Sequence, residues 1–152
     1  MSCKLISFDV SACSTGYAVY EDGILVNYGN FVHKEPKKDH VALMTNDIFC
    51  FLESEKPQII VVEDVPYMNN INTFKKLERL IARVEAWAYV RDNITYAEYK
   101  PTQWRKLVAL DGETIPSKRA EAKAWAVKKT GIDQDDTAEA VLIGQAYINE
   151  WS

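Results

Sequence analysis

Cysteine and histidine are scarce in this chain, and the few that occur form no recognisable motif. The 152 residues include 3 Cys and 2 His. Cys3, Cys13 and Cys50 are odd in number and widely spaced, without a Cys-x-x-Cys pair, which argues against a disulfide framework or a zinc site. We therefore expect a protein of the reducing cytoplasm. Because Cys3 and Cys50 lie in apolar stretches, we expect both to be core residues.

Long apolar runs are also missing. No segment approaches the roughly 20 apolar residues that a membrane helix needs, and the N-terminus lacks the basic-then-apolar pattern of a signal peptide. Hydrophobic residues nevertheless make up 47% of the chain and aromatic residues 11%, which is too much for a disordered protein. We expect a single globular domain spanning residues 1–152, without a membrane partner.

The net charge of -4 is unusual for a nucleic-acid binder, but the charge is distributed unevenly. Residues 73–130 carry 13 Lys and Arg against 7 Asp and Glu, a local net charge of +6, which leaves the rest of the chain at −10. This asymmetry predicts two surfaces with different tasks. Because charged runs usually mark a solvated face, the asymmetry alone does not assign a function.

Hydrophobic periodicity predicts how strands and helices alternate along the chain. The predicted strands cover residues 5–10, 15–20, 24–32, 59–63 and 94–99, and the predicted helices begin near His40, at Ile71, after Ser117 and after Asp133. The segment from Lys100 to Ile115 is expected to be a polar connection. This order predicts an α/β protein whose mixed five-stranded sheet carries helices on both faces, and sites in such sheets lie at the strand ends.

Carboxylates close two of the apolar strands and recur on the last helix. Asp9 lies in an otherwise apolar strand, where burial of an unpaired carboxylate costs several kcal/mol. Glu63 ends another apolar strand. Asp136 and Glu139 are three residues apart, so they share one face of a helix. Together these positions predict a cluster of acids at one edge of the sheet.

A cluster of this kind favours bound divalent metal, because converging carboxylates repel one another and raise the pKa of at least one of them. Oxygen ligands suit Mg²⁺ or Mn²⁺ better than zinc. Two such ions about 3.5–4 Å apart can activate a water and stabilise the leaving oxygen in phosphodiester hydrolysis. Each acid also has a structural reading as a helix cap or an ion-pair partner. The pattern does not decide between Glu63 and Asp64, or between Asp135 and Asp136.

Three segments resemble the signature blocks of the RuvC-type Holliday junction resolvases. They are residues 7–19 (Ser-Phe-Asp-Val-Ser followed by Thr-Gly-Tyr-Ala-Val), 60–65 (Ile-Val-Val-Glu-Asp-Val) and 136–140 (Asp-Thr-Ala-Glu-Ala). Their order and spacing agree across essentially the whole chain. The resemblance implies a single RNase H-like nuclease domain. It also selects the catalytic acids that hold the metal, which are Asp9, Glu63, Asp136 and Glu139. Glu139 stands where the family usually has Asp.

The resemblance further implies a substrate and an assembly. Its members are homodimers that nick four-way DNA junctions symmetrically with Mg²⁺, so we expect Mg²⁺ or Mn²⁺, two ions per site, a branched DNA partner and no small-molecule substrate. The compact length is similar to that of versions carried by bacteriophages, which implies the cytoplasm of a host cell.

Basic side chains supply candidates for DNA contacts. Lys118 occupies a place where the family has a DNA-contacting lysine, and helix N-terminal amides beside it would also hold phosphate. Typical bacterial members carry an aromatic residue where this chain has Pro66, and Tyr67 follows as a possible substitute. The candidates for DNA binding are therefore Lys76, Arg79, Arg83, Lys118, Arg119 and Tyr67.

Two other functions compete with the nuclease at this point. A non-catalytic RNase H-like module would bind nucleic acid or a protein partner without cutting, and the complete set of acids argues against it. An actin-like phosphotransferase also carries Asp followed by Ser or Thr and Gly after its first strand. That fold needs two such lobes around the nucleotide, and 152 residues are too few for both.

Overall fold

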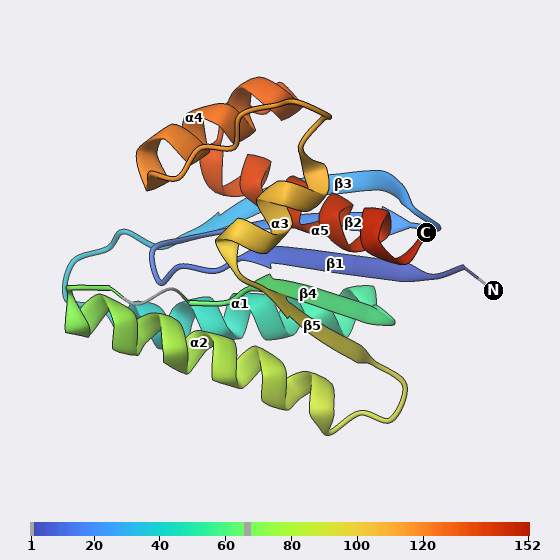
Figure 1. The fold of residues 1–152 in the computed structure, drawn as a ribbon. Coiled ribbons are helices and arrows are strands. Elements are labelled where there is room, and N and C mark those ends of the chain that lie inside the picture. Colours follow the sequence, from blue (N-terminus) through green and yellow to red (C-terminus); the bar gives the residue numbers. More distant parts are fainter. Residues whose placement is uncertain (1, 66–67) are drawn as a thin grey trace.

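A mixed sheet of five strands organises the protein (Figure 1). The computed structural model describes residues 2–65 and 68–152. The strands are β1 (Lys4–Asp9), β2 (Ser14–Glu21), β3 (Ile24–Val32), β4 (Ile59–Glu63) and β5 (Thr95–Tyr99). They lie in the order β3-β2-β1-β4-β5, with β1 antiparallel to β2 and parallel to β4. The predicted α/β sheet is therefore confirmed in its strand number and its mixed pairing.

Helices cover both faces of this sheet, as expected (Figure 1). One face packs against α1 (His40–Glu55) and α2 (Ile71–Tyr89). The other face packs against α3 (Pro101–Val108), α4 (Arg119–Thr130) and α5 (Asp135–Trp151). No helix of the described ranges is both long enough and apolar enough to cross a membrane.

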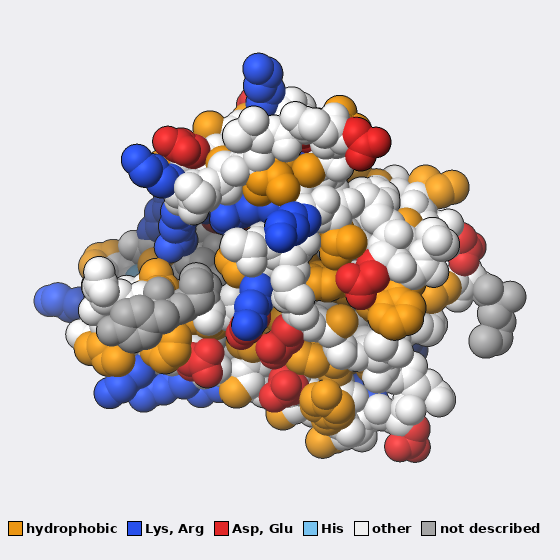
Figure 2. All heavy atoms as spheres, viewed as in Figure 1, with side chains coloured by type: hydrophobic (Ala, Val, Ile, Leu, Met, Phe, Trp, Pro, Cys, Tyr) orange, Lys and Arg blue, Asp and Glu red, His pale blue; other side chains and the backbone are white. Residues whose placement is uncertain are grey.

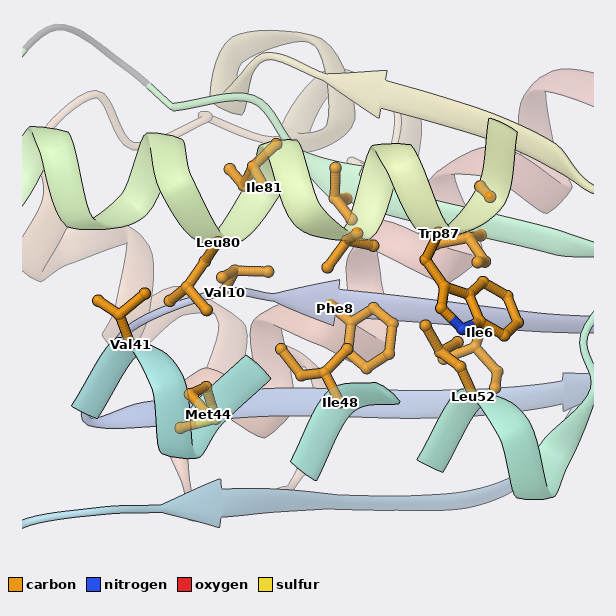
Figure 3. Close-up of a cluster of buried hydrophobic side chains, with 14 of the residues drawn as sticks. Ile6, Phe8, Val10, Val41, Met44, Ile48, Leu52, Leu80, Ile81 and Trp87 are labelled. Atoms are coloured by element: carbon orange, nitrogen blue, oxygen red, sulfur yellow. The ribbon is translucent and has the colours of Figure 1, made fainter. Parts of the chain in front are cut away.

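Strand β1 is buried on both faces because successive side chains of a strand point in opposite directions. Ile6 and Phe8 contact the layer of α1 and α2, and Figure 3 shows Phe8 beside Ile48 and Ile6 beside Leu52 of α1. Leu5 packs on the opposite layer, where the Ser7 hydroxyl donates a hydrogen bond to the Ala140 carbonyl of α5. Each fully buried apolar side chain of this size contributes about 1.5–3 kcal/mol. The two-sided burial holds the end of β1 in a fixed place.

Helix α5 approaches the sheet more closely than a side chain on β2 would allow. A Cβ atom added to Gly16 would lie 2.1 Å from the Asp136 carbonyl oxygen. Ala138 and Ala140, on the helix, are fully buried. Small residues on both sides of this contact therefore bring the first turns of α5 directly against the ends of β1 and β2.

Three local expectations from the sequence are wrong. The segment predicted as a connection contains α3, because Pro101 is at its first helical position and Trp104 and Val108 form an apolar stripe that is buried. Cys3 and Cys50 are exposed and do not belong to the core. Cys50 lies on the solvent side of α1, because the helix turns its neighbours at positions 48 and 52 toward the sheet. The caps of α4 and α5 are each one residue later than expected.

We expect the substitution Gly16→Ala to destabilise the protein by about 1–3 kcal/mol or more, because the added methyl overlaps the backbone of α5. Urea denaturation followed by circular dichroism measures the change. Gly112→Ala is the matched control, since a Cβ there meets nothing within 4 Å and only its positive φ is strained. Equal unfolding midpoints for Gly16→Ala and the wild type would contradict the close approach.

Candidate active site

The four predicted acids meet at one edge of the sheet. Asp9 is the last residue of β1 and Glu63 the last residue of β4. These strands run parallel with Phe8 paired to Val62, so the residues that follow end side by side. Asp136 and Glu139 lie in the first turns of α5, which crosses the sheet at this edge.

The acids at this edge of the sheet repel one another. Burial and the negative charges of Glu139, Glu63 and Asp136 raise the pKa of Asp9 well above its usual value. Burial is also the largest cause that raises the pKa of Glu63 to about 7, and the charge of Glu139 adds to it. A raised pKa means that the surroundings do not stabilise the ionised carboxylate. A bound cation would supply the missing positive charge.

Trp104 holds one oxygen of Glu63. Its indole Nε1–H donates a hydrogen bond of 2.6 Å to Glu63 Oε2, and this bond lowers the pKa of the carboxyl against the effect of burial. The Trp104 side chain is fully buried in the layer that includes α3 and α5. Because the packed indole cannot rotate, this hydrogen bond fixes the orientation of the Glu63 carboxylate. The indole contacts Oε2 and not Oε1.

Lys123 of α4 pairs with the acids of α5. Its ammonium nitrogen lies 3.2 Å from Asp136 Oδ1, 3.2 Å from Glu139 Oε1 and 3.7 Å from Asp135 Oδ1. Asp9 has no hydrogen bond or ion pair from its side chain to residues 2–65 or 68–152. Within the same ranges, no three His, Cys, Asp or Glu side chains are already arranged to hold one metal ion. The acids therefore share one region without being grouped as a finished coordination sphere.

An open cavity of about 760 Å³ lies over this edge of the sheet. Asp9, Glu63 and Glu139 line it, whereas Asp136 does not. Lys and Arg side chains contribute to the lining from α3 with its N-cap and from α4, and Figure 2 shows such side chains gathering between α4 and α2. The basic lining residues are Lys100, Arg105, Arg119 and Lys123. A cavity lined by both acids and basic side chains suits an anionic ligand that reacts beside a metal ion: the basic side chains would bind the ligand and the acids would bind the metal.

Arg105 is a functional candidate that the sequence analysis missed. The residue is only 7% exposed, and its Nε atom has no hydrogen-bond partner among residues 2–65 and 68–152. It forms no ion pair with a described carboxylate, although its charge lowers the pKa values of Glu63 and Glu139. A buried guanidinium without a paired anion is costly, so this one is available to an anionic ligand. The sequence pattern that could have identified Arg105 is the apolar stripe of α3, because Arg105 is adjacent to Trp104, which belongs to the buried side of that helix.

The predicted DNA-binding residues are distributed over several surfaces. Arg119 lines the cavity, and Lys118 is the exposed N-cap of α4 just outside it. Lys76 and Arg79 are exposed on α2 and do not line the cavity. Arg83 donates a hydrogen bond to the Thr45 hydroxyl of α1.

The remaining sequence candidates have different outcomes. Pro66 and Tyr67 lie outside the residues that the structure describes. Asp64, the rival of Glu63, also lines the cavity, but its position is one residue beyond the end of β4. Asp135, the rival of Asp136, contacts Lys123 at a longer distance than Asp136 does.

In metal-stripped protein we expect Glu63 to make stability depend on pH. Its pKa of about 7 in the folded state is above the ordinary value of 4.5, so its contribution is present below about pH 4.5 and is lost as the pH rises through 7. The free energy of unfolding should fall by up to about 3 kcal/mol from this group between pH 5 and 8. Glu63→Gln should reduce this fall, as measured by urea denaturation in EDTA. Glu78→Gln, on the exposed side of α2, should keep the wild-type slope. An unchanged slope in Glu63→Gln would refute the assignment.

Comparisons with known proteins identify the fold. No protein-family model matches the sequence, and no curated protein matches it either. The structure of Thermus thermophilus RuvC in complex with a Holliday junction substrate matches with a TM-score of 0.69 at 14% identity, over 96% of this chain and 93% of that chain. The fowlpox virus Holliday junction resolvase matches with a TM-score of 0.66 at 11% identity, over 97% and 99% of the two chains. The yeast mitochondrial Holliday junction resolvase matches with a TM-score of 0.61 at 15% identity, over 97% and 78%. The chain therefore has the RNase H-like fold of RuvC and related resolvases, as the sequence predicted.

Proposed function

We propose that this protein is a metal-dependent endonuclease that hydrolyses phosphodiesters at four-way DNA junctions. The observation that carries the proposal is the cavity that acids from β1, β4 and α5 line together with the buried Arg105, which pairs with no carboxylate of the described residues. The shared fold supports the choice of substrate, since one structure with this fold is a RuvC bound to its Holliday junction substrate. Binding without cutting, as in a non-catalytic module, is the alternative that the experiments below distinguish.

The donor set suits Mg²⁺ or Mn²⁺. Asp9, Glu63, Asp136 and Glu139 offer only carboxylate oxygens, which these hard cations prefer. The raised pKa values of Asp9 and Glu63 indicate that added positive charge is favourable there. When bound, such a cation supplies an activated water and stabilises the charge that develops on phosphate oxygens. The chain's own contribution is to hold these carboxylates in place by β1, β4 and α5.

Basic residues around the acids would hold the DNA backbone. Arg105 reaches the cavity from α3 and can donate two parallel hydrogen bonds to a phosphate, which its planar guanidinium favours. Arg119 and Lys100 line the same cavity and add positive charge for the neighbouring phosphates. Lys118, Lys76 and Arg79 are further from the acids, and we propose that they contact more distant parts of the backbone.

We also propose that the protein acts as a homodimer. A four-way junction is close to two-fold symmetric, and release of two duplexes requires one nick in each of two strands. The described acids of one chain line a single cavity, so a two-fold pair of chains would present two such cavities to the two strands. Paired nicks at symmetric positions of a synthetic junction would support this assembly.

Asp9→Asn should lower junction cleavage by at least about a hundredfold, because the amide cannot replace the carboxylate as a metal ligand. The measurement is nicking of end-labelled four-way, three-way and duplex DNA with Mg²⁺, and gel-shift binding to the same junction in Ca²⁺ or EDTA. Binding should persist, and chelation by EDTA should abolish cleavage by the wild type. Asp92→Asn, on an exposed loop, is the control and should cut normally. Full activity of Asp9→Asn would reject the site, whereas junction binding by the wild type without nicking at any Mg²⁺ or Mn²⁺ concentration would favour the non-catalytic module.

Arg105→Met should lower the cleavage rate by about 10- to 1,000-fold, because the phosphate loses a donor that the packing of α3 holds in place. Arg105→Lys should recover part of the rate, since it keeps the charge but not the paired donors. The neighbouring Lys106→Met removes one exposed charge from the same helix and should have a small effect. Comparable losses in the Lys106 and Arg105 variants would indicate a general charge effect and contradict a specific role of Arg105.

A further inference from the structure

Lys123 is placed in the acid cluster by the packing of α4 on α5. Ala122 and Ala126, on either side of Lys123 along α4, are fully buried, and Ala126 belongs to the core cluster that includes α5. Glu121 and Ala124, the neighbours on the solvent side of α4, are exposed. Rotation of the helix would expose the buried alanines, so Lys123 is held on the side that faces α5. The lysine therefore reaches the acids from a fixed backbone position and not from a flexible loop.

This ion pair differs from an ordinary surface pair in its burial. The exposed fraction is 22% for the Lys123 side chain, 16% for Asp136 and 6% for Glu139. Surface pairs contribute little because water screens them, whereas charges this far from water interact more strongly. The carboxylates around Lys123 raise its pKa above the usual lysine value despite burial, so it carries its charge at neutral pH.

The partners of the carboxylate oxygens divide the cluster into two parts. Lys123 occupies one oxygen of Asp136 and one of Glu139, and the pair at Asp135 adds to this part. The other part consists of Asp9, whose side chain has no partner in the described ranges, and of Glu63, which Trp104 contacts through Oε2 only. The direct ion pairs of Lys123 are with acids of α5, whereas at Asp9 the charge of Lys123, and at Glu63 the charges of Arg105 and Arg119, act without an ion pair among the described residues.

We propose that the ammonium of Lys123 takes the place of one of the two divalent ions expected for this cluster, so that each chain binds one ion, at Asp9 and Glu63. This inference rests on the metal requirement in the proposed function and deepens it. An ammonium 3.2 Å from Asp136 and Glu139 neutralises these acids and repels a second divalent ion from the same oxygens. Unlike a metal ion, the ammonium of Lys123 cannot bind and activate a water. Its role is therefore to position the acids of α5 and to supply a fixed positive charge.

The test counts bound metal without any measurement of cleavage. Mn²⁺ is titrated into the DNA-free protein and followed by calorimetry and electron paramagnetic resonance, which distinguishes an isolated ion from a coupled pair. The wild type should bind one Mn²⁺ per chain. Lys123→Met keeps the apolar stem of the side chain and removes the charge, so it should bind a second Mn²⁺ and give the coupled signal. Lys128→Met, an exposed lysine on the same helix, is the matched control and should bind one.

Each result separates this inference from the proposed function. Two Mn²⁺ ions in the wild type would overturn the inference while the metal-dependent nuclease stands, because Lys123 would then move aside for the second ion. One ion in both the wild type and Lys123→Met would also overturn it. No bound Mn²⁺ in the wild type would reject the metal requirement itself. Circular dichroism verifies that Lys123→Met is folded before titration, and Lys123→Gln provides a second neutral side chain with the same expectation.

Discussion

The close packing of α5 on the sheet is the constraint on which the site depends. Gly16 leaves room for the backbone of α5 at Asp136, and hydrogen bonds from Ser7 to Ala140 and from Tyr20 to Val141 hold the helix further along. Because these contacts fix the distance and the rotation of α5, they bring a helical pair of acids to the ends of two strands. Without them the four carboxylates would belong to separate surfaces.

Bringing acids together away from water creates an electrostatic cost that the surrounding residues partly offset. Trp104 stabilises Glu63 through a hydrogen bond, Lys123 stabilises the acids of α5, and Arg105 acts on both groups through its charge. Asp9 receives the least help, and its pKa rises well above its usual value. This imbalance supports the proposed cation beside Asp9 and Glu63 and the proposed phosphate beside Arg105.

The geometry around the strand ends bears on two ambiguities of the acidic pattern. Glu63 accepts a hydrogen bond from the buried Trp104, whereas Asp64 follows the strand and its backbone N–H donates to the Tyr99 carbonyl. Asp136 is less exposed than Asp135, and it is closer to Lys123. Both comparisons favour the acids that the family resemblance selected, although their catalytic role stays a prediction.

The sequence by itself determined the strands, the long helices and the acids at the ends of β1 and β4, because burial leaves a periodic pattern of apolar residues that a charged residue interrupts visibly. It missed α3, Arg105 and the contacts of Lys123. Those depend on side chains that meet across the fold, such as Trp104 with Glu63, which are 41 residues apart. Local patterns record which face of an element is buried. Only the tertiary structure decides which charged groups share a cavity, since that follows from how closely α4 and α5 pack against the sheet.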